Sequence, residues 1–191
     1  MKRTIYSRLA VIAAVATVQL AGQATAAGTA GLDQKFVATL NDYVKLRKGA
    51  LKDLPALKPN SAPGDVLAQQ GRMAERIQAA RSGAHQGDIC TPEVAAELKR
   101  LIAMSMQGPH GPAIRKSLNN AEVTSGAAPL VVNGRFPDKL PVASTPPTLL
   151  LNLPRLPMEV EYRVVGRALV LRDSTANVII DFVPDALPVN R

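Results

Sequence analysis

The residues best able to do chemistry in this sequence gather in one short stretch. Cys90 is the single cysteine, Asp88 lies two residues before it and His85 five residues before it. A thiol beside an imidazole is the arrangement of a cysteine nucleophile. Because Thr91 and Pro92 are typical of a helix start, the sulfur would lie near a helix N-terminus, where the dipole lowers a thiol pKa. These residues define one hypothesis, a thiol-dependent hydrolase centred on His85, Asp88 and Cys90.

A metal-dependent hydrolase is a second chemistry for the same residues. His85, Asp88 and His110, with Cys90, offer nitrogen, oxygen and sulfur ligands. Zinc sites usually hold closely paired ligands, whereas these two histidines lie 25 residues apart in turns rich in Gly and Pro. Walker A loops, dinucleotide fingerprints and G-x-S-x-G elbows do not occur. We therefore predict no cofactor, no dedicated metal site and no catalytic cluster, and we interpret Cys90 as a small buried hydrophobe.

Composition narrows the class of protein further. The 191 residues carry 23 Lys and Arg against 15 Asp and Glu, a formal charge of +8, and 47% of them are apolar. This apolar content excludes an intrinsically disordered chain. A single cysteine excludes a disulfide scaffold, and 3% aromatics without Trp disfavour a stacking platform for single-stranded nucleic acid.

A basic surface offers binding to an anionic partner. The candidate side chains are spread over the whole chain: Lys45, Lys48, Arg72, Arg76, Arg163, Arg167 and Arg172. We expect the partner to be a protein or an anionic component of the cell envelope, and we expect no nucleic acid. The oligomeric state stays open.

The first residues have the order of a secretory signal peptide. Residues 1–8 are basic without an acid, residues 9–21 are apolar, and residues 24–26 read Ala-Thr-Ala, a small-residue cleavage pattern. A helix of 13 residues spans only about 20 Å, short of a hydrocarbon core of about 30 Å. Gln23 stands where lipidation would need a cysteine. We predict cleavage after residue 26, no lipid anchor, no later transmembrane segment, and a periplasmic or secreted domain of residues 27–191.

The elements that must position these residues fall into two parts of one α+β domain. Apolar residues at helical spacing predict helices over residues 32–52, 65–84 and from Pro92 to about Met106, with Thr91 as N-cap, and a short fourth helix over 113–119. Prolines and β-branched residues then predict strands. We expect three to four helices, within residues 32–120, packed on a small antiparallel meander within residues 127–184.

The hairpin is the sharpest prediction in the strand part. Gly166 and Arg167 suit a type II′ turn, which would pair Val165 with Ala168 and Glu161 with Arg172. The residues predicted to face the core are Tyr162, Val164, Leu169 and Leu171. A third strand over 178–182 should add Ile180 and Phe182 to that face and leave Asp181 on the other.

Two weaker strand candidates are residues 130–132 and 149–153. Prolines flank the second, which suits an edge segment. A third functional hypothesis is therefore that residues 148–153 pair with a strand of a partner.

Four segments resemble a family of uncharacterised exported bacterial proteins with no assigned activity. They are residues 84–95 (AHQGDICTPEVA), 147–154 (PTLLLNLP), 161–167 (EYRVVGR) and 181–184 (DFVP). The resemblance covers most of the chain after the leader and implies export and a single domain, without chemistry. Its members often have an aromatic residue in place of Cys90, which argues against a nucleophile. Our leading hypothesis is an exported, non-catalytic binding domain, and the alternative is the thiol- or metal-dependent hydrolase.

Overall fold

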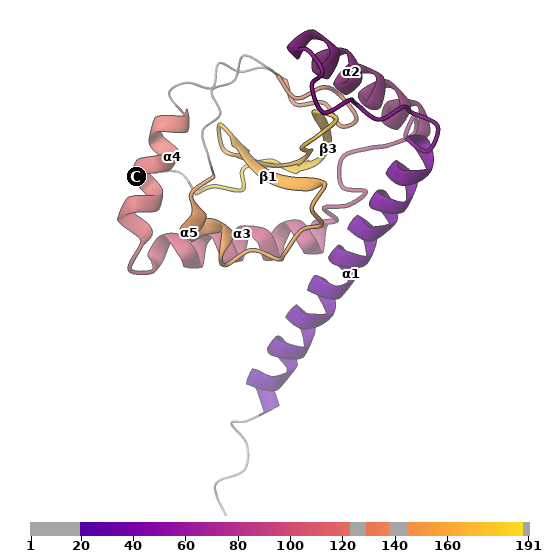
Figure 1. Ribbon diagram of the computed structural model, residues 1–191. Helices are drawn as coiled ribbons and strands as arrows, with labels where there is room; N and C mark the ends of the chain where they lie inside the picture. Colours follow the sequence, from indigo (N-terminus) through magenta and orange to yellow (C-terminus); the bar gives the residue numbers. More distant parts are fainter. Residues whose placement is uncertain (1–19, 123–128, 138–144, 189–191) are drawn as a thin grey trace, which may run out of the picture.

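Helices fill the N-terminal part of the chain and a small sheet fills the C-terminal part (Figure 1). The computed structural model describes residues 20–122, 129–137 and 145–188. Its three-stranded sheet is antiparallel with the order β1-β2-β3. The predicted α+β class is therefore confirmed. The basic start of the predicted leader and most of its apolar run lie outside the described residues.

The helices follow the apolar periodicity, with shifted ends. They are α1 (Leu20–Ala50), α2 (Pro63–Ala80), α3 (Pro92–Gln107), α4 (Gly111–Glu122) and α5 (Pro147–Leu150). The first helix begins twelve residues before the predicted start at residue 32, so the backbone of residues 24–26 is helical. Figure 1 shows its first turns projecting beyond the sheet. None of the described helices is long and apolar enough to cross a membrane.

Side-chain hydrogen bonds to the backbone lie at the C-terminal end of α2 and at the N-terminal end of α3. Thr91 Oγ1 accepts from the Val94 N–H at 3.4 Å, with Pro92 in the first turn, so the predicted N-cap is confirmed. The Asn133 side-chain amide donates to the carbonyls of Gln78 and Arg81 at 2.9 and 3.0 Å. The helix ends at Ala80, before the predicted residue 84, and these bonds help to satisfy the carbonyls at its end.

The hairpin of β1 (Val160–Val165) and β2 (Ala168–Asp173) has the predicted register. Val165 faces Ala168 and Glu161 faces Arg172. Gly166 has φ of +55°, whereas Arg167 is not among the residues with positive φ. A positive φ at the first loop position alone is the signature of the type II′ turn.

The third strand, β3 (Val178–Val183), contains a bulge that the alternation did not predict. Leu171 pairs with Asp181 but Arg172 pairs with Ile179, so one extra residue lies between them. Ile180 joins the main core as predicted. The prediction for the next two residues is wrong, because the bulge shifts the alternation. Phe182 packs in the cluster on the other face of the sheet, and Asp181 pairs with Leu171 on the core face, where it is 0% exposed.

Neither weaker strand candidate is a strand. Residues 130–132 lead into a turn in which the Gly134 N–H bonds to the Val131 carbonyl at 3.0 Å. The following backbone bonds to β3 instead, through an isolated bridge of Arg135 with Val178. Residues 147–150 form α5, because a proline suits the first position of a helix. The hypothesis that residues 148–153 pair as a strand with a partner is therefore wrong in its premise.

One apolar core joins the helices to the sheet. Its side chains from α1 to α4 include Phe36, Leu40, Ile77, Leu98, Ile102 and Ile114, and its strand residues include Leu169, Leu171, Val178 and Ile180. A smaller cluster on the other face contains Val170 and Ile179, with Leu130, Phe136 and Phe182 packed against it. The segment 129–137 thus covers the face that the helices leave open.

Candidate binding surface and the surroundings of Cys90

Cys90 lies in the core rather than at an exposed catalytic position. It is 5% exposed and belongs to the main apolar cluster. Burial raises the pKa of the Cys90 thiol, and the negative charge of Asp181 raises it further. This is opposite to the lowering that the helix N-terminus was expected to cause. The thiol is therefore protonated at neutral pH, the less nucleophilic form.

The buried carboxylate of Asp181 explains why the loop before α3 has its shape. Its oxygens accept backbone N–H bonds from Gly87 at 3.1 Å, Ile89 at 2.9 Å and Cys90 at 2.7 Å. Gly87 has φ of +93°, a region that glycine enters without strain. Asp181 thus replaces water for three loop amides and fixes the backbone that carries Cys90.

Of the other predicted catalytic and metal residues, Asp88 shares a cavity with Cys90, but neither histidine does. Asp88 accepts from the backbone N–H of His85 at 2.7 Å, which closes a local turn, and both side chains are exposed. This cavity, of about 560 Å³, is lined by Cys90, Asp88, Lys99 and eight further residues, and neither histidine is among them. His110 lines a different cavity, of about 300 Å³, beside α3 and α4. In the part of the chain that the structure describes, no group of three or more His, Cys, Asp or Glu could hold a metal.

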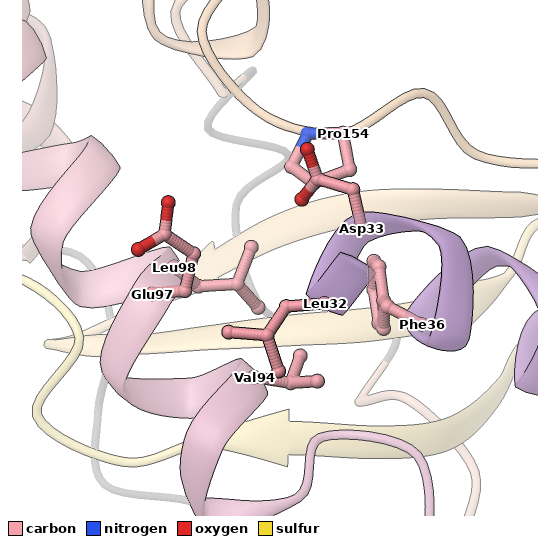
Figure 2. Close-up of a pocket in the computed structure, with 7 residues that line it drawn as sticks. All are labelled: Leu32, Asp33, Phe36, Val94, Glu97, Leu98 and Pro154. Atoms are coloured by element: carbon pink, nitrogen blue, oxygen red, sulfur yellow. The ribbon is translucent and has the colours of Figure 1, made fainter. Parts of the chain in front are cut away.

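A small cavity between α1 and α3 has two carboxylates at its rim (Figure 2). Its volume is about 10 Å³, about the space of one water probe. Phe36, Val94 and Leu98 form apolar walls, and Glu97 is already paired with Arg100 at 2.6 Å. The cavity has no room for a larger ligand, so we assign it no function.

A second buried carboxylate, which the sequence analysis missed, ties α1 to the sheet. Asp173 is 0% exposed and accepts from the Tyr43 hydroxyl at 2.7 Å and from Arg47 Nε at 2.6 Å. Burial, and then the charge of Asp173, raise the pKa of Tyr43. Arg47 stands in the sequence among exposed lysines, so nothing in its spacing marked it as the partner of a residue 126 positions away.

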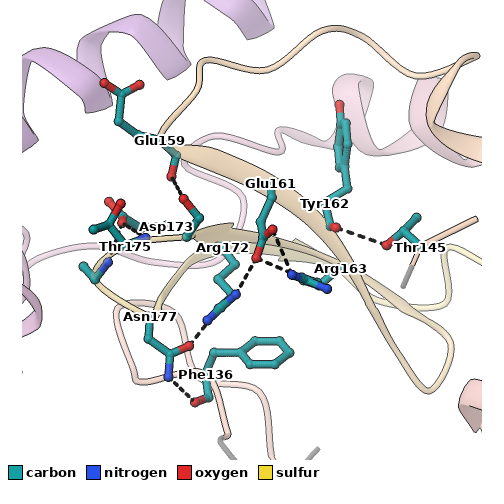
Figure 3. A network of polar contacts seen from close by, with 12 residues as sticks. Phe136, Thr145, Glu159, Glu161, Tyr162, Arg163, Arg172, Asp173, Thr175 and Asn177 are labelled. Carbon is teal, nitrogen blue, oxygen red and sulfur yellow. Dashed lines mark hydrogen bonds and ion pairs between the residues drawn. The ribbon is translucent and has the colours of Figure 1, made fainter. Parts of the chain in front are cut away.

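The predicted basic residues divide into paired and unpaired ones. On the hairpin, Glu161 lies between Arg163, at 2.8 Å, and Arg172, which also donates to Asn177 (Figure 3). Burial alone would raise the pKa of Glu161. The hydrogen bonds from the two arginines outweigh burial and hold this pKa below its ordinary value. Two cations share one carboxylate, so this cluster keeps a net positive charge.

The remaining predicted basic residues lie on α1, α2 and the β1–β2 turn. Arg167 pairs with Asp185 at 3.1 Å and Lys45 with Asp42 at 2.8 Å. Arg72 donates to the Gln69 side chain. Lys48 and Arg76 are exposed and have no ion-pair partner among the described residues.

A groove runs beside β1, on the side of the strand that faces away from β2. Its volume is about 410 Å³. One wall is β1 from Val160 to Arg163, and the other is the end of α5 with the segment that follows it, including Leu150, Leu153 and Arg155. The Tyr162 hydroxyl donates to the Pro154 carbonyl at 3.1 Å and holds the two walls together. Sequence reasoning missed this groove, because the second wall was expected to be a strand.

Comparison of the chain with protein-family models, with curated proteins and with solved structures found no match. The resemblance drawn from the four sequence segments therefore stays a prediction.

Proposed function

We propose that this protein is an exported, non-catalytic domain that binds an anionic partner, either a protein or a component of the cell envelope. The observation that carries the proposal is that the buried polar groups of the protein are bonded within the fold, whereas several exposed cations are not. The buried ones, Asp173, Asp181 and Cys90, are enclosed in the core or bonded within the fold, whereas cations such as Lys48, Arg76 and Arg155 face outward without an ion-pair partner among the described residues.

Charge supports an anionic partner more than a neutral one. The chain carries +8, of which Lys2, Arg3 and Arg8 belong to the predicted leader. Removing residues 1–26 would leave a side-chain charge of +8 − 3 = +5. An excess of this sign attracts acidic surfaces and raises their association rate.

Export is tested on the full chain expressed with a tag at its C-terminus. We expect the tagged product outside the cytoplasm, with a mass that corresponds to a start near Ala27. A product of full length that stays in the cytoplasm would contradict export. The binding experiment would then test the anionic partner separately.

Binding is tested with the exported product and two anionic probes, polyglutamate and vesicles that contain phosphatidylglycerol. We expect binding to at least one probe, weakening as salt is added, and no binding to phosphatidylcholine vesicles. Charge reversal at two exposed positions, Lys48→Glu with Arg76→Glu, should weaken binding several-fold, by about 1 kcal/mol. Equal binding to neutral and anionic vesicles, or no binding to either anionic probe, would overturn the proposal.

The hydrolase alternative is tested through the thiol itself. Because burial raises the pKa of Cys90, we expect alkylation by iodoacetamide at about pH 8 to be at least about a hundredfold slower in the folded protein than in urea. Cys90→Ser should leave binding to the anionic probes unchanged. Rapid alkylation of the folded protein, or loss of binding in Cys90→Ser with the fold intact, would favour the alternative.

A further inference from the structure

We propose that the outer edge of β1 binds an extended peptide in which acidic and apolar residues alternate, adding it to the sheet as a strand antiparallel or parallel to β1. This inference rests on the proposed function and names the partner as a protein and the groove beside β1 as its site. It replaces the predicted pairing of residues 148–153 with a different edge.

The register shows which backbone groups face outward. Val165 and Ala168 flank a two-residue turn, so they exchange backbone hydrogen bonds with each other. Hydrogen-bonded pairs alternate along an antiparallel ladder, so Arg163 and Val170 form the next such pair. The alternate residues, Tyr162 and Val164, therefore direct their N–H and C=O groups away from β2. A peptide strand binds to a sheet through groups of this kind.

Two contacts confirm this direction, and they occupy the Val160 N–H and the Tyr162 carbonyl. Thr145 Oγ1 donates to the Tyr162 carbonyl at 3.1 Å, and the Val160 N–H bonds to the Pro157 carbonyl at 3.0 Å. No hydrogen bond from a described residue reaches the Tyr162 N–H or the backbone groups of Val164. These three groups are the ones that a peptide strand would satisfy.

The opposite edge of the sheet is already occupied. The Asn133 N–H bonds to the Ile179 carbonyl at 2.8 Å, and the Ile179 N–H bonds to the Gly134 carbonyl at 2.8 Å. The Phe136 N–H bonds to the Asn177 carbonyl at 2.9 Å. An incoming strand would have to displace segment 133–136 from β3, so the edge of β1 is the one that accepts a partner.

The walls of the groove decide which side chains the peptide carries. On one side of an added strand, apolar residues would contact Leu150, Leu153 and Leu156. Side chains on the other side would lie beside the Glu161 cluster, which Arg163 and Arg172 leave positive (Figure 3). Arg155, exposed at the groove, adds a further cation. Since alternate residues of a strand face opposite sides, the complement is an alternating apolar and acidic sequence.

The experiment uses labelled peptides of the length of β1, six residues. One alternates valine with glutamate, and the control alternates valine with lysine. We expect the exported protein to bind the glutamate peptide at least about tenfold more tightly than the lysine peptide. Arg155→Glu and Leu150→Glu should each weaken binding of the glutamate peptide at least about fivefold. The matched controls, Lys58→Glu in the loop before α2 and Leu67→Glu on α2, change exposed residues outside the groove and should leave it within about twofold.

Hydrogen exchange of single amides tests the geometry. In the free protein the amides of Tyr162 and Val164 should exchange faster than those of Arg163 and Val165, which bond to β2. The glutamate peptide at saturation should slow Tyr162 and Val164 at least about tenfold and leave Arg163 unchanged. Protection spread evenly over β1, or confined to another element, would overturn the inference.

The outcomes separate this inference from the proposed function. If the vesicles with phosphatidylglycerol bind but the glutamate peptide does not, the inferred site on β1 is wrong, and the proposed binding of an anionic partner is still supported. If Lys58→Glu weakens binding of the peptide as strongly as Arg155→Glu does, the peptide binds by net charge and the site on β1 is also wrong. If no anionic probe binds, both proposals fail.

Discussion

Two aspartates of the sheet, Asp173 and Asp181, hold helical segments through oxygen atoms that no water reaches. Asp173 bonds to Tyr43 and Arg47 of α1, and its second oxygen accepts the N–H of Ala176 in its own turn at 2.8 Å. Asp181 bonds to three amides of the loop before α3. A buried carboxylate is stable only when such partners replace its hydration, so neither residue is available for acid–base work without breaking the fold.

Asp181→Asn should destabilise the protein by about 3 kcal/mol. The substitution replaces one accepting oxygen with an N–H₂ group that faces the loop amides, and it leaves buried donors unsatisfied. Urea unfolding followed by circular dichroism measures the change in the free energy of unfolding. The control is Asp185→Asn, at an exposed ion pair with Arg167, which should change that free energy by less than about 0.5 kcal/mol. Equal effects of the two variants would contradict the assigned role of Asp181.

The Glu161 cluster should make the protein less stable as the pH falls. The folded protein holds the pKa of Glu161 below its ordinary value of 4.5, so its contribution is present above that pH and is lost as the pH falls through the folded pKa. Glu161→Gln should therefore lower stability near neutral pH by about 1 kcal/mol, since the side chain is partly exposed. The difference from the unmodified protein should shrink on acidification. A difference that stays constant down to about pH 3 would contradict this explanation.

At the scale of elements, the hairpin was predictable and the bulge next to it was not. The register of β1 and β2 follows from the two-residue turn at Gly166 and from the alternation of apolar residues, both of which are local. The bulge in β3 lies beside Asp181, whose bond to the Gly87 N–H spans 94 residues, and no local pattern marks it. Alternation alone therefore placed Phe182 in the wrong cluster.

The same distinction applies to the candidate site. The N-cap at Thr91 was readable from three adjacent residues, and the interpretation of Cys90 as a small buried hydrophobe is confirmed, but the groups that surround the thiol were not predictable. The sequence shows a thiol before a helix; it does not show that the sheet brings apolar side chains and the Asp181 charge around it. The groove beside β1 escaped prediction for a similar reason, since α5 and the edge of β1 meet only in the folded chain.

Gly111→Ala should destabilise the junction of α3 and α4. A Cβ atom at this glycine would lie 2.0 Å from the Met106 carbonyl oxygen and 2.8 Å from its carbon, so the backbone must shift. We expect a loss of at least about 2 kcal/mol, read as a lower Tm. Gly49→Ala is the matched control in α1, where a Cβ meets nothing within 4 Å, and it should raise the Tm by removing a flexible residue from a helix. Two variants with the same Tm would contradict the close approach at Gly111.

At the scale of the whole molecule, the helices and strands share one apolar core. Phe36 and Leu40 of α1 lie in the same cluster as Leu169 and Ile180 of the sheet. Such a core favours the predicted single domain over two independent parts.

We therefore expect one cooperative unfolding transition. Urea titrations followed by far-ultraviolet circular dichroism, which reports mainly the helices, and by tyrosine fluorescence should have the same midpoint. Tyr162 lies in β1 and Tyr43 in α1, so Tyr43→Phe isolates the signal of the sheet among the described tyrosines. Midpoints that differ by more than the error of the fit would show that the helical part and the sheet unfold separately.

The contacts of Asp181 also determine when the loop before α3 can fold during synthesis of the chain. A ribosome delivers the chain from the N-terminus, so the loop at Gly87 to Cys90 emerges some 90 residues before the carboxylate that binds it. Until β3 is synthesised, three amides of that loop and the apolar surface around Cys90 face solvent or a chaperone. A chain that stops before Val178 would lack both the acceptor and the strand, and it would be a substrate for proteolysis rather than a smaller version of the domain.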